Sequence, residues 1–137
     1  MRYDGVAGLG QVNRRMLARL AKRTGTTRAT LDCDASLFAS SGKQARMSYK
    51  GERGYMPMLA FWSELGMVAH DDFRNGNTSP GGDALGFLKE AVAQLPAGLE
   101  QVKVRSASAW CQAELLDHCQ DEGYPSCITA RRDEAVM

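Results

Sequence analysis

The stretch from residue 30 to residue 37 (Thr-Leu-Asp-Cys-Asp-Ala-Ser-Leu) constrains the fold most, because polar and apolar side chains alternate along it. Successive side chains of a β-strand point to opposite faces, so Leu31 and Cys33 share an apolar face. Asp32, Asp34 and Ser36 then share the other face. Two carboxylates on one strand face repel each other, and a cation, a phosphate or a shared proton usually offsets that cost. The pattern therefore predicts a half-buried strand whose polar face carries a chemical centre.

Length and composition place the chain among ordinary soluble globular domains. It has 137 residues, of which 44% are hydrophobic and 24% are charged, enough for one domain with a core. No apolar run approaches the roughly 20 residues of a membrane span. The N-terminus carries no hydrophobic signal segment, so a cytoplasmic protein without a membrane partner is expected. The four cysteines form no Cys-x-x-C pair and there are only two histidines, which favours reduced core thiols over a zinc site.

The net charge of +1 conceals an uneven distribution. Residues 1–30 hold seven Lys and Arg against one acidic residue, and the rest of the chain holds ten against fifteen. A basic lead before an acidic body suits a polyanionic partner such as DNA. A solvated helix face is the alternative explanation of the same charges.

The rest of the chain is predicted to alternate between helices and strands, separated by turns rich in glycine and proline. A helix is expected over 10–22 after a glycine-containing connection, and a polar excursion over 40–55 follows the acidic strand. Further strands are expected over 55–62, which is apolar on both faces, and over 67–73, 101–106 and 124–130. Helices are expected over 83–95 and 109–122, the second capped by Ser108. The order β-β-β-α-β-α-β favours an antiparallel meander followed by two strands parallel to the first.

Four segments occur in this order along the chain: Leu31-Asp32-Cys33-Asp34-Ala35-Ser36, Tyr49-Lys50-Gly51-Glu52-Arg53-Gly54-Tyr55, Asp72-Phe73-Arg74-Asn75-Gly76-Asn77 and Val104-Arg105-Ser106-Ala107-Ser108-Ala109. Together they resemble the DDE transposases of bacterial insertion sequences, in the branch whose first motif reads Asp-x-Asp-Ala-Thr. The resemblance implies an α/β, ribonuclease H-like mixed sheet that is incomplete at the C-terminus. It also implies that residues 1–28 are a basic helical lead from a missing upstream region and that residues 29–137 are a partial catalytic domain.

The resemblance further implies an enzyme that cuts and joins DNA phosphodiesters. In such enzymes three acidic side chains hold two Mg²⁺ ions, which assist the displacement at phosphorus. Asp34 matches the first acid, because it precedes a small residue and a hydroxyl at Ala35 and Ser36. Asp32 lies on the same face and is a supporting group or an alternate metal ligand. A solvated strand end that caps local N–H groups is the competing explanation for the acidic pair.

The second and third acids of the family pattern are missing from this chain. Ala107 occupies the second acidic position in Arg105-Ser106-Ala107-Ser108-Ala109, and a methyl group cannot bind Mg²⁺. The third acid lies further along in the family, and Glu134 is too close to the last predicted strand to match it. The resemblance therefore implies a catalytically dead chain that binds Mg²⁺ poorly, if at all.

Polar and basic side chains around the excursion and the later loops are candidates for DNA contact. They are Lys43, Arg46, Lys50, Arg53, Arg74, Asn75, Asn77 and Arg105. A solvated hairpin explains the basic residues of the excursion equally well, and a tight turn explains the asparagines.

Two other functions remain open at this point. The chain fits a non-catalytic remnant that binds DNA or associates with a full-length transposase and inhibits it. Because a sheet of this kind has one face short of helices, self-association is also expected. The Asp32-Cys33-Asp34 stretch also fits the Asp-x-Asp motif of haloacid-dehalogenase-like phosphatases, with Asp32 as nucleophile and Asp34 as acid and base.

Overall fold

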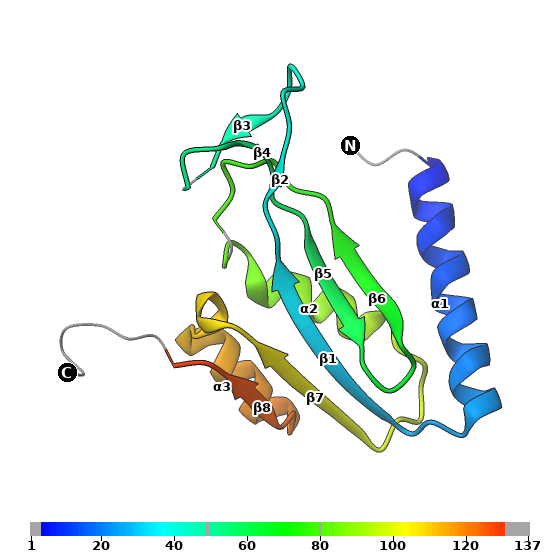
Figure 1. Ribbon diagram of the computed structural model, residues 1–137. Coiled ribbons are helices and arrows are strands. Elements are labelled where there is room, and N and C mark those ends of the chain that lie inside the picture. Colours follow the sequence, from blue (N-terminus) through cyan, green and yellow to red (C-terminus); the bar gives the residue numbers. More distant parts are fainter. Residues whose placement is uncertain (1–3, 49, 80, 131–137) are drawn as a thin grey trace.

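A computed structural model describes residues 4–48, 50–79 and 81–130 (Figure 1). The helices are α1 (Asp4–Thr24), α2 (Ala84–Ala93) and α3 (Ala113–Glu122), with one 3₁₀ turn at Ser108–Trp110. The strands are β1 (Arg28–Ala35), β2 (Phe38–Ala39), β3 (Arg46–Met47), β4 (Arg53–Tyr55), β5 (Met58–Trp62), β6 (Met67–Asp72), β7 (Gln101–Ser106) and β8 (Ser126–Ile128). No helix in the described ranges is long and apolar enough to cross a membrane.

The main sheet has five strands in the order β6-β5-β1-β7-β8. The β5 strand is antiparallel to β1, and β6 is antiparallel to β5. The β7 strand is parallel to β1, and β8 is parallel to β7. The mixed sheet expected from the element order is therefore confirmed, with the acidic strand β1 at its centre.

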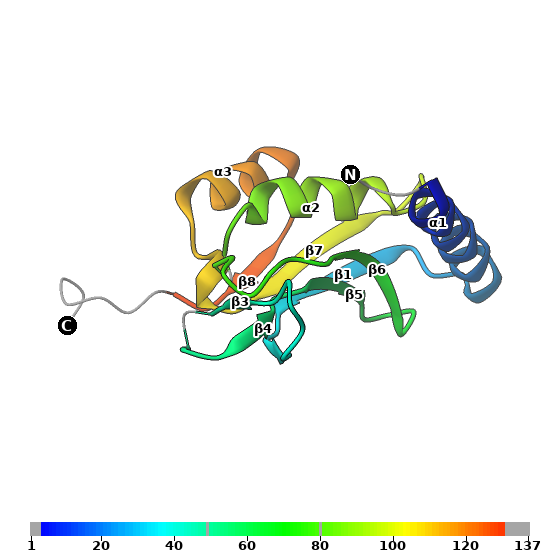
Figure 2. The same cartoon turned by 90° about the horizontal axis from the view of Figure 1, so that it is seen from above.

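Helices cover one face of this sheet and leave the other face open within the described part of the chain. Figure 2 shows α2 and α3 on the same side of the sheet, with α1 beside the β6 edge. The Asn13 side-chain amide fastens α1 to that edge by donating to the carbonyl oxygens of Val68 (3.1 Å) and Ala69 (3.3 Å). Leu17 and Ala21 of α1 are buried in the same core as the sheet. The domain boundary expected at residue 28 stays a prediction.

The alternation that predicts β1 is present in the structure. Leu31 and Cys33 are buried under the helices, whereas Asp34 is exposed on the open face. The neighbouring strand β5 alternates in the same way, since Trp62 is buried but Leu59 and Phe61 are 41% and 40% exposed. The expectation of a strand buried on both faces was therefore wrong for β5, because no described element covers the side of the sheet that these two residues occupy.

Local element bounds differ from expectation in four further places. Helix α1 begins at Asp4, and the segment around Gly8 and Gly10 is helical rather than a connection. The polar excursion folds into a second sheet of order β2-β4-β3, and the strand expected over 55–62 is divided at Met56 and Pro57, since proline lacks a ladder N–H. The helix expected over 109–122 starts at Ala113, with Gln112 rather than Ser108 at its N-cap.

The loop after β6 is joined to the small sheet by a close backbone contact. The Gly76 N–H donates to the Gly54 carbonyl over 2.9 Å, and a Cβ at Gly76 would lie 2.3 Å from that oxygen. The Asn75 side chain accepts from the Arg46 N–H (2.7 Å) and donates to the Gln44 carbonyl (2.6 Å). The small sheet is thereby held beyond the carboxyl end of β1 (Figure 1).

Candidate functional site

Asp34 and Ala107 lie at the carboxyl ends of two adjacent parallel strands. The register pairs Asp32 with Arg105 and Cys33 with Ser106, so residues 34 and 107 occupy the next positions in line. The Ser106 hydroxyl donates to the Cys33 carbonyl over 2.9 Å and holds the two strand ends together. Both Asp34 and Ala107 are exposed, and Ala107 directly follows the last residue of β7, next to the carboxyl end of β1.

Asp32 is engaged by Arg105 on the same face. The Arg105 Nε and Nη2 donate to the two Asp32 carboxylate oxygens over 2.5 and 2.7 Å. These hydrogen bonds and the Asp32 charge raise the pKa of Arg105, and the guanidinium stays charged. A metal ion at Asp32 or a DNA phosphate at Arg105 must therefore compete with this bidentate pair.

The described residues do not fit a two-metal centre, although DDE transposases generally use divalent metal ions. Within 4–48, 50–79 and 81–130, no three His, Cys, Asp or Glu side chains gather closely enough to hold a metal ion. Asp34 offers one carboxylate, and Ala107 offers none. Ser36 is exposed just past β1, and its backbone N–H donates to the Pro57 carbonyl over 3.1 Å. Glu134 lies outside the described residues.

Three of the predicted DNA-contact residues bind the backbone of this chain, and their contact with DNA stays a prediction. Arg53 donates to the carbonyls of Ala45 (3.1 Å) and Gly42 (3.2 Å). Arg74 donates to the Met56 and Gly82 carbonyls over 3.0 and 2.9 Å, and partial burial lowers its pKa despite nearby carboxylates. The Asn75 side chain bonds to the backbone N–H of Arg46 and the backbone carbonyl of Gln44. Each of these side chains has a structural role that its residue type alone did not reveal.

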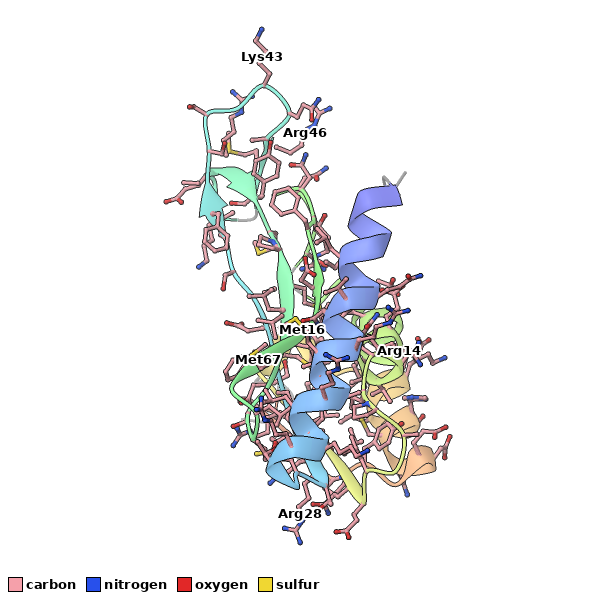
Figure 3. The ribbon with its side chains drawn as sticks, turned by 90° about the vertical axis from the view of Figure 1, so that its right-hand side faces the viewer. Arg14, Met16, Arg28, Lys43, Arg46 and Met67 are labelled. Atoms are coloured by element: carbon pink, nitrogen blue, oxygen red, sulfur yellow. The ribbon has the colours of Figure 1, made fainter. Side chains whose placement is uncertain are left out.

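The remaining candidates lie on the surface of the small sheet and its loops. Lys43, Arg46, Lys50 and Asn77 are exposed, and Figure 3 shows Lys43 and Arg46 at the far end of the molecule from Arg28. Because the small sheet lies beyond the carboxyl end of β1, these cations are on the same side of the molecule as Asp34. Whether they touch DNA stays a prediction.

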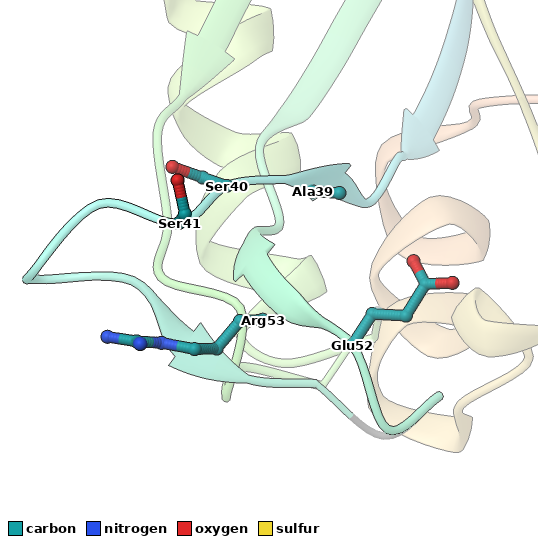
Figure 4. A pocket seen from close by; sticks show the side chains of 5 residues that line it. All are labelled: Ala39, Ser40, Ser41, Glu52 and Arg53. Atoms are coloured by element: carbon teal, nitrogen blue, oxygen red, sulfur yellow. The ribbon is translucent and has the colours of Figure 1, made fainter.

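A hollow in the small sheet is a feature that the motif pattern did not indicate. It is lined by Ala39, Ser40, Ser41, Glu52 and Arg53 (Figure 4). The Ser40 hydroxyl accepts from the Gly42 N–H over 3.1 Å, and the Arg53 guanidinium is held by the carbonyls of residues 42 and 45. The hollow therefore lacks a cluster of uncommitted charged groups, and we assign it no ligand.

The mixed sheet of order β6-β5-β1-β7-β8 has the ribonuclease H-like fold, which transposase catalytic domains share. A family model described as "Transposase DDE domain group 1" matches residues 2–136. The chain therefore belongs to this family of DDE transposase domains. No significant match is found among curated proteins.

Two solved transposase structures have a similar fold. The catalytic domain of the Mos1 mariner transposase superposes with a TM-score of 0.56 at 10% identity, over 97% of this chain and 65% of that one. The piggyBac transposase, in a synaptic complex with hairpin DNA, gives a TM-score of 0.54 at 17% identity, over 80% of this chain and 24% of that one. The chain thus spans less than two thirds of either relative.

Proposed function

We propose that this chain contributes the first acidic residue of a DDE transposase site, Asp34, and does not cut DNA by itself. The observation that carries the proposal is the placement of Ala107 beside Asp34 at the ends of β7 and β1. Transfer of DNA strands in this family uses metal ions held by several carboxylates. A single exposed aspartate beside a methyl group is too poor a ligand set for that chemistry.

Restoring a carboxylate at position 107 tests this directly. Neighbouring strands lie about 4.8 Å apart, so Ala107→Asp places two carboxylates within reach of one cation. We expect Mn²⁺ to broaden the NMR signals of residues around Asp34 saturably in Ala107→Asp but not in the native chain. Ala107→Asp combined with Asp34→Asn should lose that binding. Saturable binding by the native chain at Asp34, or none by Ala107→Asp, would refute the proposed role of this pair.

DNA is the proposed partner, contacted by the exposed cations of the small sheet. Lys43 and Arg46 support this proposal because they are exposed beyond the carboxyl end of β1. Contacts to phosphate release counterions, so affinity should fall steeply as salt rises. Lys43→Glu with Arg46→Glu should weaken duplex binding in a gel-shift or anisotropy titration. Binding that ignores both salt and these substitutions would contradict the proposal.

A non-catalytic, inhibitory role is the alternative proposal, supported by the open face of the sheet. Leu59, Phe61 and Val68 are exposed on β5 and β6, an apolar surface of the kind that marks protein contact. A full-length transposase is the partner this role requires, and adding the chain should then reduce strand transfer by that enzyme. The phosphatase alternative is weakened because its nucleophile, Asp32, is held by Arg105.

The insertion-sequence origin is likewise a proposal. It is tested by the DNA on both sides of the reading frame, which should encode a DNA-binding region upstream. Downstream, it should encode an acidic helix and end in a terminal inverted repeat. Unrelated genes on both sides would favour an independent binding or inhibitory protein.

A further inference from the structure

Helix α1 presents a face to solvent on which apolar and basic side chains lie in one line. Leu9, Val12 and Met16 are 69%, 51% and 50% exposed. Residues three, four and seven apart share one side of a helix, so Arg19 and Arg23 continue the line from Val12 and Met16. Arg15 and Lys22 flank it, and all four of these basic residues are exposed. The helix holds five Lys and Arg against Asp4, a net charge of +4.

Helix α3 presents the opposite charge on its outward face. It holds four acidic residues and neither Lys nor Arg, a net charge of −4. Leu115 and Cys119 are buried beneath it, so Glu114, Asp117 and Asp121, at spacings of three and four residues, line the solvent side. Leu116 is 37% exposed on the flank of this face, about 100° around the helix from Asp117. The outward face of α3 therefore also combines an apolar side chain with a row of charges.

The two helices cannot neutralise each other within one molecule. Helix α1 lies beside β6 at one edge of the main sheet, and α3 packs over the β7 and β8 end (Figures 1 and 2). In contrast, α1 of one copy and α3 of another are free to meet. Opposite charges on facing surfaces steer two molecules together and select their orientation.

We propose that this chain associates with itself head to tail, with the α1 face of one copy docking against the α3 face of the next. The contact joins two different surfaces, so each added copy leaves one surface of each kind open. The proposal is independent of the catalytic proposal above, because neither helix face includes Asp34 or Ala107.

The apolar line on α1 favours a protein over DNA as the occupant of this face. Leu9, Val12 and Met16 gain nothing from phosphate oxygens, whereas an apolar side chain such as Leu116 of another copy would remove them from water. The arginines then meet carboxylates, for which the planar guanidinium gives bidentate hydrogen bonds. Among the described elements, α3 is the helix that offers four acids without a basic residue.

Sedimentation velocity on the full chain measures the association. At about 0.05 M salt, where charges act over some 10 Å or more, the weight-average mass should rise with protein concentration. Raising the salt to about 0.5 M should weaken the association at least about tenfold, because screening then acts within a few ångströms. A mass that stays that of a monomer at low salt and high concentration would overturn the proposal.

Charge reversal identifies the two surfaces. Arg15→Glu with Arg19→Glu lowers the charge of α1 from +4 to 0, and Asp117→Lys with Asp121→Lys raises that of α3 from −4 to 0. Each double variant alone should remain monomeric, because one of its two faces has then lost the net charge that attracts the other. An equimolar mixture should form dimers again, because the unchanged α3 of one variant meets the unchanged α1 of the other. A mixture that stays monomeric would overturn the proposal, provided circular dichroism and melting show that the variants fold.

Two matched variants separate this contact from other causes. Arg14→Glu with Lys89→Glu changes the net charge equally but alters the opposite flank of α1 (Figure 3) and the exposed surface of α2, so association should persist. Leu59→Ser with Phe61→Ser should also leave the salt-sensitive association intact. Association that disappears with the Leu59 and Phe61 changes, yet survives charge reversal, would place the contact on the open sheet face. Monomers that bind duplex DNA through Arg15 and Arg19 would make α1 a phosphate-binding face instead.

Discussion

The Arg105 guanidinium spans the gap between β7 and β1 and donates to both carboxylate oxygens of Asp32. Both side chains are partly exposed, at 44% and 38% of their surface. Water therefore screens the pair, and its contribution to folding is small. The pair matters mainly for function. Both oxygens of the Asp32 carboxylate, two residues from Asp34, already accept hydrogen bonds from Arg105.

Removing the guanidinium should lower thermal stability slightly and in a salt-dependent way. Arg105→Gln leaves Asp32 without its ion-pair partner, and the decrease in melting temperature should shrink as salt rises. Differential scanning fluorimetry at low and high salt measures both effects. Asp32→Asn is the control, because the combined variant should then lose no more than either single one. A large, salt-independent loss would show that Arg105 acts through packing.

A carboxylate at position 107 should make stability depend on divalent cations. In Ala107→Asp the new charge faces Asp34 on the neighbouring strand, and like charges this close destabilise the folded state. Melting temperature should therefore fall in chelator and recover on adding Mg²⁺, because the ion binds only the folded site. The native chain should show no such recovery, and an equal Mg²⁺ response in both chains would contradict the prediction.

The buried thiols should make the fold sensitive to alkali. Burial raises the pKa of Cys33 from 9.0 to about 12, and burial also raises the pKa of Cys119. The unfolded chain ionises these thiols first, so the stability they contribute is complete below pH 9. For Cys33 it declines as the pH rises from 9 toward 12, by up to about 1.4 kcal/mol per pH unit. Urea melts from pH 8 to pH 11 measure the slope, which should decrease in Cys33→Ala.

Truncation of two neighbouring residues on β5 should change the free energy of unfolding by very different amounts. Trp62 is fully buried and its indole N–H donates to the Arg28 carbonyl over 3.0 Å, so Trp62→Ala should cost about 3–5 kcal/mol. Phe61 faces the open side, and Phe61→Ser should change stability little while raising solubility. Urea unfolding and a solubility assay distinguish the two. A comparable loss from Phe61→Ser would show that something covers this face.

A methyl group at Gly76 should disturb the small sheet without unfolding the main one. Its Cβ would lie 2.3 Å from the Gly54 oxygen and 2.6 Å from the Arg46 oxygen, and both are backbone atoms that cannot rotate away. Gly76→Ala should therefore cost about 1–3 kcal/mol locally. NMR shifts should change in β2, β3 and β4 and stay constant in β7. Gly10→Ala in α1 is the control, because no atom lies within 4 Å of its added Cβ. It should leave the NMR shifts of β2, β3 and β4 unchanged.

Much of the main sheet follows from local patterns. The alternation in β1, the bounds of β7 and the presence of a helix before and after it were predictable, because side-chain periodicity depends only on which residues are near in sequence. The start of the helix after β7 was not. The glycine-containing start of α1 and the strands of the small sheet were not. Those residues have weak preferences of their own, and packing or pairing with distant backbone decides their conformation.

The candidate site divides in the same way. The residue types alone indicate that Asp34 has a carboxylate and that Ala107 lacks one, since those are properties of single side chains. Only the folded chain decides that the two positions are neighbours, that Arg105 occupies Asp32, and that Arg53, Arg74 and Asn75 bind backbone carbonyls. The parallel register brings together residues 73 positions apart, and no local pattern encodes which polar groups meet across such a distance.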